Sequence, residues 1–287
     1  MTSLPEANDF LGWVLWILQE YGGMLLAGAW KTMVIAVIAT AVGCLIGFAV
    51  GIVQTIPTDR RENPIQWAVV GFFKVLLNIY VEVFRGTPMM VQAAFIYYGA
   101  AMLFDIHMET FRAALLIVSI NTGAYMAETV RGGILSIDPG QTEGAMAIGM
   151  NHTQTMLNVV LPQALRNIMP QIGNNLIINI KDTCVLSIIG VVELFYNVKS
   201  ITGATYAFFP AYSIAMVVYF ILTFACSRIL RAVEDRMAGP ESYDLAMTDM
   251  LMGEGTMRYR QNHTETNADY RAHKEHGRDI GEREGGL

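Results

Sequence analysis

Charged residues and cysteines are both scarce in this chain of 287 residues. Asp, Glu, Lys and Arg make up 15% of it, against about 25% in an average protein. Hydrophobic residues reach 53%, and the mean hydropathy is +0.39. The three cysteines (Cys44, Cys184 and Cys226) stand singly in separate apolar runs, without the spacing of a zinc site. This composition excludes an ordinary soluble domain, and we expect no metal site.

The sequence motifs of nucleotide binding and catalysis are absent as well. No GxxxxGK[ST] phosphate loop occurs, so the chain is not expected to bind ATP in that manner. No Ser/His/Asp set of nucleophile and base stands out. The net charge of −6 does not supply the basic face of a nucleic-acid binder. We therefore predict that the chain is not an enzyme by itself, has no cofactor of its own and binds no nucleic acid.

Long apolar runs dominate the chain instead. About 20 helical residues cross the roughly 30 Å of hydrocarbon in a bilayer, and five runs reach this length alone or with their flanks. They are residues 27–53, 89–104, 113–127, 172–192 and 211–229. A sixth run, 67–83, is interrupted by Lys74 and Asn78, and we interpret it as an interfacial helix leading into the second span. The sequence predicts an all-α integral membrane protein with about five transmembrane helices in a lipid bilayer.

Lys and Arg in the short flanks predict an orientation with the N-terminus outside and the C-terminus inside. The cytoplasmic side then receives Arg60, Arg61, Lys74, Arg85, Arg131, Arg166, Arg228, Arg231 and Arg236, and the outer side receives Lys31, Arg112 and Lys199. We divide the chain into an outer N-terminal segment (1–24), a transmembrane domain (25–238) and a polar cytoplasmic tail (239–287). The polar, mixed-charge composition of the tail predicts that it is largely disordered.

A polar stretch, residues 138–162, separates the third and fourth spans. Asp138 and Asn151 are each expected to cap a short helix, with a glutamine three residues later completing a capping box. Gly149 suits the elbow between the two helices, and Pro162 is expected to end or redirect the second. The side chains expected to pack inward are Ala145, Ile148, Met156, Leu157 and Val160, leaving Glu143, His152 and Gln154 toward water. Such a structured loop favours contact with a partner; the alternative is a loop that lies on the lipid headgroups.

Polar side chains recur on one face of two consecutive spans. Asn121, Tyr125 and Glu128 are spaced i, i+4, i+7, as are Asn175, Asn179 and Asp182, with Lys181 adjacent. Polar groups at membrane depth are costly and mark a pathway or a pair. We assign a candidate substrate pathway to Asn121, Tyr125, Glu128, Asn175, Asn179 and Lys181. The alternative is hydrogen bonding between helices, with Lys181–Asp182 or Glu128–Arg131 ion pairs; Glu82 and Arg85 could likewise pair at i, i+3.

Small residues form a further stripe on the first span. Gly43, Gly47 and Gly51 follow each other at i+4, which lets two helices approach closely in lipid. This stripe can pack within the chain or against a second copy. We favour packing within the chain.

Three ordered groups of residues resemble the permease subunits of bacterial ATP-binding-cassette (ABC) importers of the polar amino-acid group. The first is RGTPMMVQ at 85–92. The second is ETVRGGI at 128–134 followed by PGQTEGAMAIG at 139–149, which is similar to the family's EAA loop. The third comprises LPQALR at 161–166, KDT at 181–183, SIIG at 187–190 and EL at 193–194. The resemblance covers about residues 28–236, and Gly144 replaces the usual first alanine of Glu-Ala-Ala.

The resemblance implies that the loop 138–162 couples the spans to a cytoplasmic dimer of ABC ATPase subunits, which carries the ATP and magnesium. The coupling residues it implies are Glu143, Gly144, Ala145, Gly149, Leu161 and Pro162. It also implies a second permease subunit, identical or related, and an extracytoplasmic amino-acid-binding protein. The expected function is inward translocation of a polar amino acid by alternating access, in the bacterial cytoplasmic (inner) membrane.

A different function class is a self-contained channel or ion-coupled carrier. It would use Lys181, Asp182 and Glu128 as charge-handling groups and would transport without an ATPase. The sequence does not distinguish glutamine, glutamate, arginine or histidine as substrate, nor a homodimer from a heterodimer.

Overall fold

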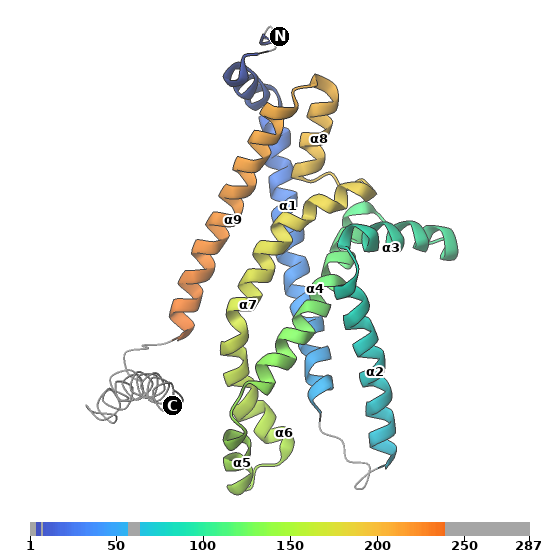
Figure 1. Ribbon diagram of the computed structural model, residues 1–287, viewed down its shortest axis with the longest axis vertical. Helices are drawn as coiled ribbons and strands as arrows, with labels where there is room; N and C mark the ends of the chain where they lie inside the picture. Colours follow the sequence, from blue (N-terminus) through green and yellow to red (C-terminus); the bar gives the residue numbers. More distant parts are fainter. Residues whose placement is uncertain (1–3, 7, 57–63, 239–287) are drawn as a thin grey trace, which may run out of the picture. The chain divides into compact units, whose positions relative to one another are not determined.

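The computed structural model describes residues 4–6, 8–56 and 64–238, and within these ranges it contains helices and no strand. The chain divides into two units, Met1–Met237 and Ala238–Leu287. The predicted disordered tail, 239–287, lies outside the described residues. The elements in order are α1 (Phe10–Thr55), α2 (Pro64–Gly86), α3 (Met89–Phe104), α4 (Thr110–Leu135), α5 (Pro139–Ala147), α6 (His152–Thr155), η1 (Met156–Val160), α7 (Leu161–Asp182), η2 (Thr183–Ile189), α8 (Leu194–Thr205) and α9 (Phe208–Ala238) (Figure 1).

Four described helices are long and apolar enough to cross a membrane, namely α1, α2, α4 and α9. A bent pair, His152–Ile189 with Leu194–Thr205, would make a fifth span, broken by a bend of 53°. The count agrees with the predicted number, but the interfacial interpretation of 67–83 does not agree with the helix found there. α2 has 23 residues and meets the length and composition of a span, whereas α3 has only 16. Lys74 is no obstacle, because its ammonium donates to the Ile56 carbonyl at 2.6 Å, at the end of α1.

The first helix is far longer than a bilayer requires. α1 has 46 residues, which corresponds to about 69 Å at 1.5 Å per residue. Asp9 caps it by accepting a hydrogen bond from the Gly12 amide at 2.8 Å. The outer segment predicted as separate, 1–24, therefore runs from Phe10 onward into the first span without a break.

The glycine stripe of α1 packs against α4 within the chain, as favoured from the sequence. A Cβ atom added at Gly47 would lie 2.3 Å from the Met126 Cβ, and one at Gly51 would lie 2.7 Å from a Val130 methyl. A Cβ at Gly43 would meet Thr122 at 2.6 Å. The two backbones thus approach as closely as small residues allow, and they run side by side in Figure 1.

The second short helix of the polar loop does not end at Pro162, contrary to expectation. The chain forms a π-helical turn over Met156–Val160 and continues directly into α7. In this turn the Leu161 amide bonds to the Met156 carbonyl, five residues back. Wider π turns relax the clash that a proline ring makes with the preceding turn of an α-helix. The π turn therefore explains how the helix passes Pro162.

The real break follows η2, at Gly190. Gly190 has φ +80°, a conformation that favours glycine, and α8 begins four residues later, at Leu194. Glu193 caps α8 by accepting hydrogen bonds from the Phe195 and Tyr196 amides at 2.9 and 2.7 Å. Its carboxylate also accepts from the hydroxyls of Tyr219 and Thr32, so one fully buried side chain joins α1, α8 and α9.

Candidate functional site

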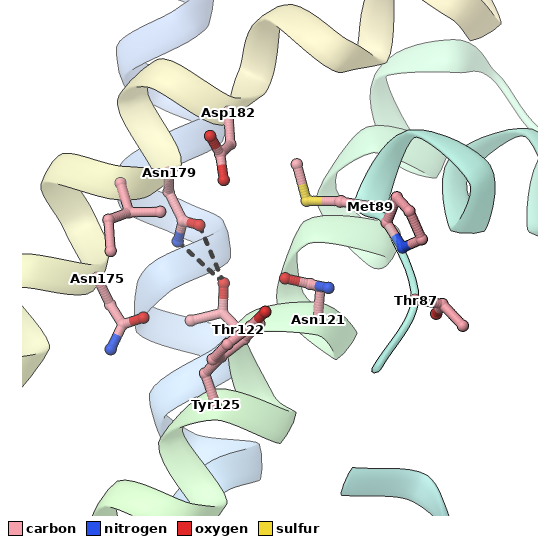
Figure 2. Close-up of a pocket in the computed structure, with 10 residues that line it drawn as sticks. Thr87, Met89, Asn121, Thr122, Tyr125, Asn175, Asn179 and Asp182 are labelled. Carbon is pink, nitrogen blue, oxygen red and sulfur yellow. Dashed lines mark hydrogen bonds between the residues drawn. The ribbon is translucent and has the colours of Figure 1, made fainter. Parts of the chain in front are cut away.

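A cavity of about 270 Å³ lies where α4, α7 and the start of α3 meet. Its lining residues are Thr87, Pro88, Met89, Asn121, Thr122, Tyr125, Asn175, Ile178, Asn179 and Asp182. Figure 2 shows Asn175 and Asn179 of α7 on one side, the Thr87–Met89 segment on the other, and Asn121 of α4 between them. We call it the amide cavity. Three asparagines and one carboxylate give it hydrogen-bonding groups near the middle of α4, where a lipid environment would supply none.

Asn179 is fixed by the two helices behind the cavity. Its Nδ2 donates to the Thr122 hydroxyl at 2.9 Å (Figure 2). It also donates to the Thr40 hydroxyl at 2.7 Å. Thr40 lies on α1 and Thr122 on α4, and all three residues are buried. The glycine stripe brings these helices together, so the packing of α1 against α4 also sets the position of this amide.

Asn121 is held through Gln92, which was not among the predicted site residues. The Asn121 Nδ2 donates to the Gln92 Oε1 at 2.9 Å. The Gln92 Nε2 in turn donates to the carbonyls of Phe84 and Thr87, both at 2.8 Å. Gln92 thereby clamps the turn between α2 and α3 that forms one wall of the cavity. The signal for it was its place at the end of the RGTPMMVQ motif.

The structure brings together most, but not all, of the predicted pathway residues. Asn121, Tyr125, Asn175 and Asn179 line the amide cavity, and Glu128 does not. Lys181 is exposed and lies outside the lining, where its neighbour Asp182 contributes instead. Asp182 completes the i, i+4, i+7 face with Asn175 and Asn179, whereas Lys181 falls about 100° away around the helix.

A second polar cavity, of about 200 Å³, lies between α1, α2 and α4. Its lining residues are Gln54, Asn78, Val81, Glu82, Arg85, Glu128 and Arg131. We call it the charged cavity. Arg85 forms an ion pair with Glu128, so the sequence alternatives Glu82–Arg85 and Glu128–Arg131 are wrong. The Arg85 guanidinium also lies over the Tyr125 ring, 5.6 Å from its centroid, and Tyr125 belongs to the amide cavity.

The loop 138–162 forms two capped helices that meet at Gly149, as predicted. Gly149 has φ +89°, its amide bonds to the Met146 carbonyl, and the Met150 amide bonds to the Ala145 carbonyl. This pair of bonds is a Schellman motif, the usual end of a helix at glycine. Asn151 forms a complete capping box with Gln154.

The capping box predicted for the first helix is not formed. Asp138 caps the Gly140 amide at 2.7 Å, and the Gln141 side chain instead accepts a hydrogen bond from Gln163 at 3.3 Å. This second contact links α5 to the beginning of α7.

The exposed surface of this hairpin is more apolar than predicted. Ala145 and Val160 are buried, and Glu143, His152 and Gln154 are exposed, as expected. Ile148 and Leu157, however, are 77% and 56% exposed instead of packed inward. Of the other residues implied in coupling, Gly144, Gly149 and Pro162 are exposed and Leu161 is half-buried. The hairpin thus leaves two large apolar side chains accessible beside its polar ones.

Comparisons with known proteins agree with this architecture. Residues 67–239 match the family model of binding-protein-dependent transport system inner membrane components. The glutamine transport system permease protein of Escherichia coli K12 is 37% identical over 215 residues, which cover 75% of this chain and 93% of that protein. The arginine transport system permease protein of Bacillus subtilis strain 168 is 33% identical over 196 residues, covering 68% and 86%.

Solved structures give the same result. One chain of an amino acid ABC transporter superposes with a TM-score of 0.69 at 33% identity, covering 80% of this chain and 99% of that one. A chain of the MetNI methionine ABC transporter, at 19% identity and a TM-score of 0.58, shares the fold. The family model, the relatives and the solved structure agree, and the chain belongs to the family of binding-protein-dependent transport system inner membrane components, as a multi-pass permease of the bacterial inner membrane.

Proposed function

We propose that this permease carries a polar amino acid inward through the amide cavity, driven by ATP hydrolysis on a partner subunit. The amide cavity is the observation that carries the proposal, because it combines three asparagines with the Asp182 carboxylate in a space of about 270 Å³. The names of the relatives and of the solved structure, which refer to glutamine, arginine and amino acids, support this substrate class.

The chemistry of the lining fits an amino acid better than an inorganic ion. Asp182 can accept hydrogen bonds from an α-ammonium group, and asparagine side chains both donate and accept, so they suit a carboxylate or a side-chain amide. The Thr87–Met89 wall is held by Gln92 rather than by the ligand, which leaves the cavity formed in advance. Preformed polar sites lose less free energy to ordering when the ligand binds.

The hairpin α5–α6 is the proposed contact with the ATPase subunits. Glu143, Gly144, Ala145 and Gly149 belong to its first helix and elbow, and Leu161 and Pro162 lead from it into α7. Because η1 and α7 continue the second helix without a break, movement of the hairpin can pass directly to Asn175, Asn179 and Asp182. A second permease subunit and an extracytoplasmic amino-acid-binding protein complete the proposed system.

Uptake into proteoliposomes tests this function. The permease is reconstituted with its ATPase and binding protein, and uptake of labelled L-glutamine, L-arginine and L-histidine is measured with ATP inside. We expect uptake of at least one of them, and none without ATP. Asp182→Asn keeps the side-chain size but removes the charge, so KM should rise about tenfold or more, as for the loss of one charge-assisted hydrogen bond. Glu109→Gln, on the exposed end of α4, is the matched control.

Two results would contradict this proposal. Uptake by this chain alone, driven by an ion gradient, would support the carrier alternative, which the relatives and structural neighbours do not favour. Unchanged kinetics in Asp182→Asn, with ATP-dependent uptake intact, would remove the amide cavity from the substrate route.

A further inference from the structure

Two of the ionic groups that line the charged cavity form no ion pair with the described residues. Arg85 and Glu128 pair with each other, and Gln54 donates to the Asn78 Oδ1 at 2.9 Å. Arg131 and Glu82 also line the cavity, yet neither has an ion-pair partner among residues 4–6, 8–56 and 64–238. Four of the seven lining side chains carry charge, two of each sign, so the cavity is neutral overall.

Both groups are accessible to a ligand, because the side chains of Glu82 and Arg131 are exposed. Glu82 lies on α2 and Arg131 on α4, both of which are long and apolar enough to span the membrane. Ionisable side chains in spans face an aqueous cavity or a partner, because their cost in hydrocarbon is high. An unpaired cation and an unpaired anion around one cavity therefore point to a ligand that carries both charges.

We propose that the charged cavity is a second binding site for the transported amino acid, with the α-carboxylate at Arg131 and the α-ammonium at Glu82. This inference rests on the proposed function, since it takes the same substrate. A zwitterion is neutral overall, as the cavity is, and presents one charge of each sign. The volume of about 200 Å³ lies below the roughly 300–1,000 Å³ of pockets for drug-sized molecules and suits a small solute.

The two cavities share a boundary made of three side chains. Tyr125 lines the amide cavity and carries the Arg85 guanidinium over its ring. Arg85 and its partner Glu128 line the charged cavity. Substrate leaving the amide cavity would pass this boundary into the charged cavity. There Arg131 would bind its α-carboxylate and Glu82 its α-ammonium group. The Arg85–Glu128 pair then separates two sites on one route.

Equilibrium binding of a labelled amino acid to the purified permease–ATPase complex tests the second site. The probe is whichever of L-glutamine, L-arginine and L-histidine the wild type transports best. We expect two molecules bound per permease chain in the wild type. Arg131→Gln and Glu82→Gln should each weaken one of them about tenfold or more and leave the other unchanged. Asp182→Asn should weaken the other molecule, and Arg112→Gln, an exposed change near the start of α4, should alter neither.

A blocked substrate separates recognition from a structural effect. The methyl ester of the same amino acid lacks the α-carboxylate, so the wild-type second site should bind it about tenfold or more weakly than the free acid, and Arg131→Gln should lose this discrimination. Two-site binding that survives both Arg131→Gln and Glu82→Gln would overturn the second site. A single site that depends on Asp182 would overturn it as well, while leaving the proposed function standing. A wild-type complex that neither binds nor takes up amino acids would instead overturn the function.

Discussion

At the scale of single residues, the Glu193 side chain joins three helices through four hydrogen bonds. It is fully buried and accepts hydrogen bonds from two amides of α8 and from the hydroxyls of Thr32 and Tyr219. Glu193→Ala should lower the free energy of unfolding by at least about 2 kcal/mol, since the helix loses its N-cap and buried donors lose their acceptor. Thermal unfolding of the purified protein in detergent measures this loss.

Glu109 offers the matched comparison for that change. It stands at the N-cap of α4 but makes no capping bond there, and its side chain is exposed. Glu109→Ala should leave the midpoint of unfolding nearly unchanged. Equal midpoints for the two alanine variants would contradict the structural role given to Glu193.

Single residues also show which parts of the site could be predicted from the sequence. The i, i+4 spacing predicted that Asn121 and Tyr125 share a face, and that Asn175 and Asn179 share another, and the structure places all four on one cavity. Spacing along one helix does not predict which residues of two helices meet. The Arg85–Glu128 ion pair and the hydrogen bond from Asn121 to Gln92 were therefore not predicted. Thr87 and Met89 come from a third element, which only the fold brings to α4.

At the scale of elements, the elbow of the hairpin depends on one backbone conformation. Gly149 has φ +89°, which costs an L-residue roughly 1–2 kcal/mol. Gly149→Val should disturb the Schellman end of α5 and reduce ATP-driven uptake severalfold, while the spans stay folded. The ratio of amino acid transported to ATP hydrolysed measures the effect, because a misplaced elbow should separate the two activities.

Gly144 is the control within the same short helix. It is exposed, and an added Cβ would meet no atom within 4 Å. Gly144→Ala should stabilise α5 by about 0.5–1 kcal/mol and keep coupling at or above the wild-type ratio. If Gly149→Val transported as well as Gly144→Ala, the elbow would have no part in coupling.

Elements also show how far the fold could be predicted. Apolar run length and capping residues placed the hairpin, the first span and the number of candidate spans correctly. Lys74 led to the wrong interpretation of 67–83 as interfacial. Its ammonium reaches a carbonyl at the end of a neighbouring helix, that of Ile56, and is paired there. Pro162 misled because a π turn accommodates the ring, and local propensity does not reveal such a turn.

At the scale of the whole molecule, the fold depends on the close packing of α1 against α4. An added Cβ at Gly47 would lie 2.3 Å from the Met126 Cβ and 2.9 Å from the Ala127 amide, so Gly47→Ala must push the helices apart. Overpacking of this kind costs about 1–3 kcal/mol or more. Gly71→Ala on α2, where nothing lies within 4 Å, should be neutral by comparison. Thermal unfolding of both variants checks this, and similar midpoints would contradict it.

The close seam between these two helices has a consequence for energy conservation. A bacterial membrane stores a proton gradient, and each cycle of a transporter risks a leak through a file of water molecules. A single water needs a void of at least about 10–15 Å³, which backbones in contact along Gly43, Gly47 and Gly51 do not leave. We therefore expect no file of water along these three glycines, and we expect the barrier that opens and reseals to lie along the cavities, where the lining is polar.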